Sequence, residues 1–168
     1  MLDQFTFCPN CQHRLDHQGN KVVCAKCGFD QYDNPVPTTG MVFYNDNHIL
    51  LVERGHEPAK GKWDVPGGFV DVNESAEEAM CREIKEELGL ALSPTEIEYL
   101  GSFQDIYAEK GTQCVWSVFA HELNKSTELH PHDDAASVKW FAIDNLPLNL
   151  AFDGVRWSIE LFKKKHSQ

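Results

Sequence analysis

Three glutamates, Glu83, Glu86 and Glu87, stand at positions i, i+3 and i+4 of one segment. On an α-helix this spacing makes all three carboxylates project from one face. Two carboxylates about 4 Å apart repel by about 4 kcal/mol at an effective dielectric near 20, so the group needs water or a divalent cation beside it. Such oxygen ligands suit Mg²⁺ or Mn²⁺. The ordinary alternative for an acidic run is a solvated helix face.

Local signals predict the helix that would carry these glutamates. Ser75 and Glu78 form a capping box, and Gly89 is a residue that can end a helix, so we expect a helix over residues 76–88. We expect its apolar stripe to be buried and the glutamates to face the other way. The stripe consists of Ala76, Ala79, Met80, Ile84 and Leu88. Gly67 and Gly68 precede the helix in a loop where backbone can approach a ligand closely.

The whole segment fits the pattern Gly-x5-Glu-x7-Arg-Glu-U-x-Glu-Glu-x-Gly-U, where U is a bulky aliphatic residue. Every fixed position is occupied, by Gly68, Glu74, Arg82, Glu83, Ile84, Glu86, Glu87, Gly89 and Leu90. This resembles the Nudix box. The resemblance implies an α/β fold, the Nudix α/β/α sandwich with a mixed β-sheet. It also implies a metal-dependent hydrolase that cleaves a nucleoside diphosphate linked to another moiety.

The resemblance also implies roles for particular residues. The carbonyl of Gly68 and the carboxylates of Glu83, Glu86 and Glu87 would bind the catalytic Mg²⁺ or Mn²⁺, and Arg82 would orient the cluster. The general base could be Glu83, Glu86, Glu87 or a later acid such as Asp134. We rank Glu86 and Glu87 above Asp134, whose ordinary role would be in a solvated loop. The candidate substrate contacts are Arg54, Trp63, Phe69 and Tyr107; the three rings could stack on a base, although each type is more often found in a core.

A second motif consists of two Cys-x-x-Cys pairs separated by twelve residues: Cys8 with Cys11, and Cys24 with Cys27. Four thiolates at this spacing predict a structural zinc site. Disulfides are the weaker alternative because no signal peptide precedes the cysteines. His13 and His17 lie between the pairs and could compete as ligands, whereas we expect Cys81 and Cys114 in the core.

Length and charge limit the remaining possibilities. The 168 residues allow one ordinary domain, residues 35–168, and a zinc ribbon, residues 1–34, that is small enough to need its metal to fold. Residues 33–37 would be a stiff linker or an extended connection. The net charge of -11 disfavours nucleic acid as the main partner and favours a small nucleotide bound through divalent cations. With no long apolar run, we expect a soluble protein in a reducing cytoplasm, without membrane partners.

The order of elements agrees with the resemblance. Strands are expected at 39–44 and 48–53, a second hairpin at 99–107 and 113–122 around Glu109 and Lys110, and a short strand at 138–141. Val155, Ile159 and Phe162 mark a final amphipathic helix. The resemblance further implies a homodimer, since members of the family are commonly dimers.

The substrate is indicated only by finer resemblance. A ribbon before a Nudix domain resembles the NADH pyrophosphatases, but their Ser-Gln-Pro-Trp-Pro array is absent from residues 102–107, and Ile106 stands where many ADP-ribose hydrolases have proline. The shorter ribbon-Nudix group, whose enzymes act on FAD and ADP-ribose, resembles the chain through Phe152. We therefore expect cleavage of an ADP-containing dinucleotide or ADP-ribose-like compound such as FAD, ADP-ribose or NADH, releasing AMP. A non-catalytic nucleotide-binding regulator and an RNA 5′-end hydrolase are the alternatives.

Overall fold

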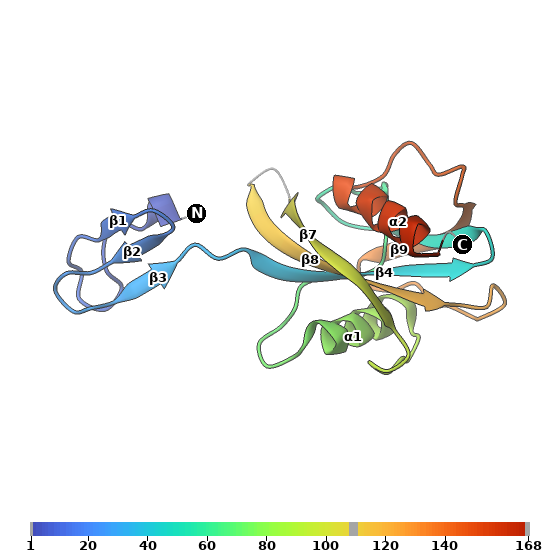
Figure 1. The fold of residues 1–168 in the computed structure, drawn as a ribbon, viewed down its shortest axis with the longest axis horizontal. Coiled ribbons are helices and arrows are strands. Elements are labelled where there is room, and N and C mark those ends of the chain that lie inside the picture. The colour runs from blue at the N-terminus through green and yellow to red at the C-terminus, as the bar shows by residue number, and fades with distance from the viewer. Residues whose placement is uncertain (1, 108–110, 167–168) are drawn as a thin grey trace.

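The computed structural model describes residues 2–107 and 111–166. Its N-terminal part contains a short 3-10 helix, η1 (Leu2–Gln4), and three strands, β1 (Asp16–Gln18), β2 (Lys21–Val23) and β3 (Asp30–Tyr32). The strands form a small antiparallel sheet in the order β1-β2-β3, drawn apart from the larger sheet in Figure 1. The core beneath it is small and includes two of the cysteines; its buried members are Leu2, Cys8, Leu15, Val22 and Cys24. Cysteines thus supply two of the five buried members of this core.

The remainder of the chain builds a six-stranded mixed sheet and two helices. The strands are β4 (Val36–Asn45), β5 (His48–Arg54), β6 (Trp63–Asp64), β7 (Glu98–Tyr107), β8 (Thr112–Glu122) and β9 (Ala135–Ala142). Their order is β6-β5-β4-β8-β7, with β9 also paired to β5. The β4–β8 pair is parallel and the other pairs are antiparallel. Helix α1 (Ala76–Leu88) covers one face and helix α2 (Asp153–His166) the other, as Figure 1 shows.

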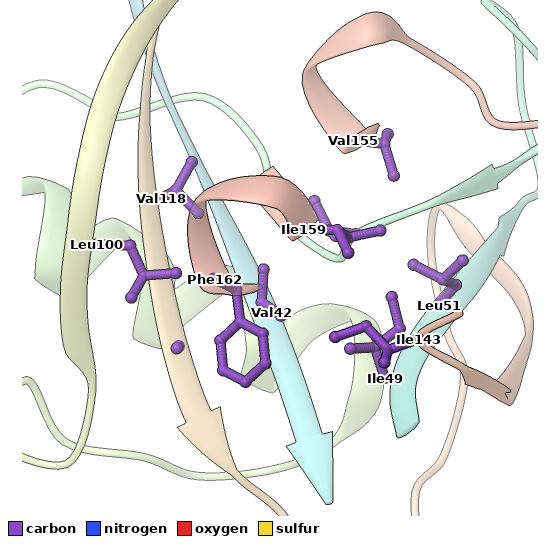
Figure 2. Close-up of a cluster of buried hydrophobic side chains, with 11 residues drawn as sticks. Val42, Ile49, Leu51, Leu100, Val118, Ile143, Val155, Ile159 and Phe162 are labelled. Atoms are coloured by element: carbon purple, nitrogen blue, oxygen red, sulfur yellow. The ribbon is translucent and has the colours of Figure 1, made fainter. Parts of the chain in front are cut away.

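The two apolar layers arise from the alternation of side chains along the strands. In β4, Met41 and Phe43 pack in the core with α1, whereas Val42 between them packs in the core with α2. Successive strand residues point to opposite faces, so a strand covered on both sides carries a continuous apolar run. Figure 2 shows the α2 side, where Ile159 and Phe162 meet Val42 and other strand residues. The predicted α/β/α sandwich with a mixed sheet is confirmed.

Most expected elements lie within a few residues of their predicted places. The helix at 76–88 has the predicted Ser75–Glu78 capping box, and Gly89 adopts a left-handed conformation after it. Glu109 and Lys110, expected in the second hairpin turn, lie outside the described residues. One difference concerns residues 36 and 37, expected in the connection: Val36 and Pro37 belong to β4 and pair with β8. Pro37 is tolerated there because it stands near the start of the strand, where a missing N–H costs least.

Candidate active site

A cavity of about 290 Å³ is lined by Gly68, Glu83 and Glu86 of the predicted motif. Its charged lining is strongly one-sided, because the acidic side chains greatly outnumber Arg54, the one cation among the described lining residues. The acidic members are Asp64, Asp71, Glu83, Glu86, Asp105, Asp133 and Asp134. A cavity with this charge balance cannot hold a diphosphate unless cations are also present.

Two glycines shape the loop that enters the cavity. The Thr39 N–H donates to the carbonyl of Gly68 at 2.9 Å, and the Met41 N–H donates to the carbonyl of Pro66 at 2.9 Å, which fastens the loop to β4. Gly67 has φ of 151°, and a Cβ there would collide with the Thr39 carbonyl. A Cβ on Gly68 would overlap the carboxylate of Glu83. Gly67 therefore requires glycine, whereas a side chain at Gly68 would displace the Glu83 carboxylate. The Gly68 carbonyl keeps a second lone pair for another ligand.

Arg82 connects the carboxylates of the motif. Its Nε and Nη2 donate to the two oxygens of Glu74 at 3.1 and 2.6 Å, and its Nη1 donates to Glu83 at 2.8 Å and to Glu86 at 3.2 Å. Its Nη2 also donates to the carbonyl of Phe69 at 3.0 Å. This guanidinium holds the pKa of Glu74 below its ordinary value. Arg82 is therefore a third means, besides water and a divalent cation, by which the crowded carboxylates are stabilised.

Glu87 lies on a different side of the helix from the one expected. It is buried, with 6% of its surface exposed, and it is not among the residues lining the cavity. At about 100° per residue, Glu87 is displaced about 40° from Glu83 in the direction of the buried Met80, whereas Glu86 is displaced the opposite way. The Gly67 N–H donates to Oε2 of Glu87 at 3.0 Å. Burial, and then the charge of Glu83, raise the pKa of Glu87 to about 8.

Asp134 reaches the same cavity from a distant part of the sequence. The His130 and His132 N–H groups donate to the carbonyls of Leu88 and Glu87 at 2.9 and 2.8 Å, which fixes this loop against the end of α1. The Gly55 N–H donates to the Asp134 carbonyl at 2.7 Å. Asp134 is exposed, as expected of a solvated loop, and this loop lies beside the cavity.

Arg54 is fixed at the cavity by three neighbours. Its Nη1 donates to Asp64 at 2.9 Å, its Nε donates to the Pro58 carbonyl at 2.8 Å, and its guanidinium lies over the Phe152 ring at 5.1 Å from the centroid. Asp64 is nearly completely buried, and burial raises its pKa to about 6 even though Arg54 opposes the shift. The pair holds the guanidinium in one orientation.

Only three of the four residues predicted to contact the substrate lie on the lining of the cavity. Arg54, Phe69 and Tyr107 line the cavity, whereas Trp63 is not among the lining residues. Trp63 instead packs against Phe141 with ring centroids 4.9 Å apart, as part of the layer below α2. Its strand, β6, directs this ring into the core because the neighbouring Asp64 takes the opposite direction, towards Arg54.

Several cavity residues were not predicted. Asp105 and Phe152 belong to this group, together with Asp64 and Trp116. Asp105 lies two residues from Tyr107 on β7, so strand alternation from Tyr107 was a signal that could have found it. Phe152 comes from the segment before α2, far from the motif in sequence, and no local pattern indicated it.

The cysteines predicted to bind zinc converge in the N-terminal part. The sulfur atoms of Cys8, Cys11, Cys24 and Cys27 all lie within 4.8 Å of one another. Among the described residues this is the one such close group of three or more potential metal ligands. His17 is engaged elsewhere, with its Nε2 at 3.1 Å from the Phe5 carbonyl. Of the two other cysteines, Cys114 is buried and Cys81 is partly buried.

The chain is similar to several known proteins. An ADP-ribose pyrophosphatase of Methanocaldococcus jannaschii is 38% identical over 122 residues, which is 73% of this chain and 70% of that protein. The NAD-capped RNA hydrolase NudC of Vibrio vulnificus is 31% identical over 150 residues, 88% of this chain but only 54% of that protein. The crystal structure of a MutT NUDIX hydrolase from Burkholderia pseudomallei has a TM-score of 0.68 and 35% identity, covering 76% of this chain and 98% of that one.

No helix in the described part of the chain is both long and apolar enough to cross a membrane.

The NUDIX domain family matches residues 34–164, which contain the cavity, the glycine loop and the glutamate helix. The chain belongs to the Nudix family.

Proposed function

We propose that this protein is a metal-dependent pyrophosphohydrolase for ADP-ribose-like compounds. Water adds across the P–O–P anhydride, so ADP-ribose would give AMP and ribose 5-phosphate. The observation that carries the proposal is the acidic cavity with Gly68, Glu83 and Glu86 together on its lining. The substrate class is supported by the 38% identity to a protein named ADP-ribose pyrophosphatase, of which the chain covers 70%.

The donor set fits a hard divalent cation. The carbonyl of Gly68 and the carboxylates of Glu83 and Glu86 are oxygen ligands, and because Gly68 has no Cβ, the Glu83 carboxylate can lie directly against this residue. We infer that these groups hold Mg²⁺ or Mn²⁺, with Glu87 as a buried carboxylate behind them. When bound, the metal would neutralise the diphosphate and lower the pKa of the attacking water.

The protein's own side chains would position the reactants. Arg82 distributes its donors over Glu74, Glu83 and Glu86, which holds the carboxylates in place. A general base must come within hydrogen-bond reach of the attacking water. Of the four predicted candidates, Glu83, Glu86 and Asp134 line the cavity and Glu87 does not. Glu83 is paired with Arg82 and only 16% of its side chain is exposed, whereas Glu86 is 50% exposed. We therefore infer that Glu86 is the first candidate and Asp134 the second.

We infer that the N-terminal part is a zinc ribbon, residues 1–34, ahead of a Nudix domain, residues 35–168. Four sulfurs within 4.8 Å of one another support zinc at this site. Two separate sheets, one ending at Tyr32 and the other beginning at Val36, support the division.

The test is a substrate panel incubated with Mg²⁺ or Mn²⁺ and resolved by chromatography. It should include ADP-ribose, FAD, NADH, diadenosine polyphosphates, nucleotide sugars and nucleoside triphosphates. We expect ADP-ribose-like diphosphates to be cleaved fastest, with AMP among the products. Faster turnover of nucleoside triphosphates than of every diphosphate would show that the substrate class is wrong, and no turnover of any compound would favour a nucleotide-binding regulator.

A second candidate is removal of an NAD cap from RNA. It is favoured by the likeness to the protein named NAD-capped RNA hydrolase, which spans 88% of this chain and therefore extends into residues 1–34. The net charge of -11 weakens it, since RNA is bound through Lys and Arg. Cleavage of NAD-capped RNA much faster than free NAD, with a strong dependence on salt, would support it.

A further inference from the structure

One wall of the cavity is made of aromatic rings from three separate segments. Phe69 follows the glycine loop, Tyr107 ends β7, and Phe152 precedes α2. Tyr107 is central: its ring centroid is 5.3 Å from that of Phe69 and 5.6 Å from that of Phe152. All three residues line the cavity. We name these three residues the ring wall.

The ring wall is not required by the core. Phe69 is 39% exposed, and neither Phe69 nor Tyr107 is among the described residues that form or pack against the two apolar layers of the sandwich. Phe152 touches the α2 layer, yet it also faces the cavity and carries the Arg54 guanidinium. Leaving such rings at the edge of a cavity exposes apolar surface to water, and a flat apolar ligand would cover that surface.

The position of the ring wall relative to the charged groups is suited to a nucleotide. Phe69 directly follows Gly68, and its carbonyl accepts from Nη2 of Arg82 at 3.0 Å, so the ring wall begins beside the proposed metal ligands. At its other end Arg54 is held over Phe152. A nucleotide could therefore place its diphosphate at the proposed metal ligands, through the divalent cation, and its aromatic base against the ring wall.

We propose that Phe69, Tyr107 and Phe152 form the nucleobase subsite, and that Phe152 and Tyr107 determine the preference for substrates that carry a base. This rests on the proposed function in naming the part of the substrate that this side of the cavity would bind. Trp63, which the sequence suggested for stacking, packs against Phe141 and the α2 layer and is not on the cavity lining.

The test is direct binding of AMP, a product that is not itself hydrolysed, compared with ribose 5-phosphate, which has no base. Both are titrated calorimetrically into the full chain with Mg²⁺ present. Since stacking on an aromatic ring is typically worth enough to change affinity by roughly 5- to 150-fold, we expect Phe152→Leu and Tyr107→Leu to weaken AMP binding by such a factor. Binding of ribose 5-phosphate should change less than twofold.

Conservative variants and a matched control separate stacking from a loss of structure. Phe152→Tyr and Tyr107→Phe keep a ring and should bind AMP as the unaltered chain does. Phe141→Leu removes a ring that packs on Trp63, outside the cavity, and should leave AMP binding unchanged. Unchanged AMP affinity in both leucine variants, equal weakening of AMP and ribose 5-phosphate, or no AMP binding by the unaltered chain at millimolar concentration would overturn the proposal.

The titrations, together with the hydrolysis of the substrate panel by the same variants, distinguish this subsite from the catalytic activity. If AMP binding depends on the rings but no diphosphate is hydrolysed, the subsite stands and the proposed function fails. If ADP-ribose is hydrolysed and the leucine variants keep both AMP affinity and kcat/KM, the function stands and the subsite fails.

Discussion

The two groups of proposed metal ligands differ in what holds them together. The four cysteine sulfurs lie within 4.8 Å of one another, in a part of the chain with a very small core. The carboxylates of α1 are instead distributed around Arg82, the Gly67 N–H and the cavity, on a helix anchored by buried apolar residues. The cysteines are thus part of the small core of their region, whereas buried apolar residues, and not the carboxylates, anchor α1. Metal removal should therefore unfold one region and only inactivate the other.

The largest expected effect is on the cysteine region. Cys8→Ser removes one of the four proposed zinc ligands and should abolish zinc binding. Because structural zinc contributes about 10 kcal/mol or more to the folding of such a site, the region should then unfold. We expect elemental analysis to find no stoichiometric zinc and limited proteolysis to cleave within residues 1–34. Cys81→Ser, which changes a cysteine outside the cluster, should keep its zinc. Full zinc content in Cys8→Ser would show that Cys8 is not a zinc ligand and that the cysteine region does not depend on this site.

The second effect is on catalysis. Glu86→Gln removes a half-exposed carboxylate from the cavity and should reduce kcat/KM roughly 10²- to 10⁴-fold, as expected for loss of a metal ligand or base. Circular dichroism and the urea midpoint should stay near those of the unaltered protein. Glu160→Gln, an exposed carboxylate on α2, is the matched control and should keep full activity. Unfolding of Glu86→Gln would show that the carboxylates do support the fold.

The third effect is on stability and depends on pH. Burial raises the pKa of Glu87 to about 8, so between its unfolded pKa of about 4.3 and pH 8 the folded protein holds a proton that the unfolded chain releases. The folded state therefore loses stability as pH rises through this window. Glu87→Gln stays neutral, so without added divalent cation it should be more stable than the unaltered chain at pH 8, by on the order of a few kcal/mol. The two proteins should converge near pH 4.

Urea unfolding at pH 4, 6 and 8 measures this difference. Added Mg²⁺ should stabilise the unaltered protein more than Glu87→Gln at pH 8, since the carboxylate then gains a positive partner. A Glu87→Gln variant that is less stable at pH 8 would mean that Glu87 is ionised in the folded protein and contributes to the fold.

The smallest effect should come from Glu74. Arg82 lowers the pKa of this carboxylate, so its contribution to stability is present above its unfolded pKa and is lost as pH falls through the lower folded pKa. Glu74→Gln lacks that contribution, so its stability should depend less steeply on pH between about 2 and 5 than that of the unaltered chain. Thermal melts across this range check the slope. An unchanged slope would show that the ion pair contributes little to stability.

The amino-acid sequence by itself determined the elements whose signals are local. The capping box at Ser75, the glycine at Gly89 and the apolar spacing between them define α1, and Cys-x-x-Cys spacing identifies the cysteine cluster. The glutamate motif also specified the family and hence the sandwich, and the family match over residues 34–164 confirms this. These features depend on residues close together in the chain, where helix geometry and turn chemistry relate spacing to position.

Only the tertiary structure decided which side chains share the cavity. Glu87 lies towards the core side of α1, because residues four apart on a helix are offset by a net angle of about 40° and the loop at Gly67 covers that side. Trp63 packs against Phe141. Phe152 contacts Tyr107, about fifty residues earlier in the chain, and Arg54, about one hundred residues earlier. Such contacts depend on strand order and on the packing of α2, which are long-range properties that no local spacing encodes.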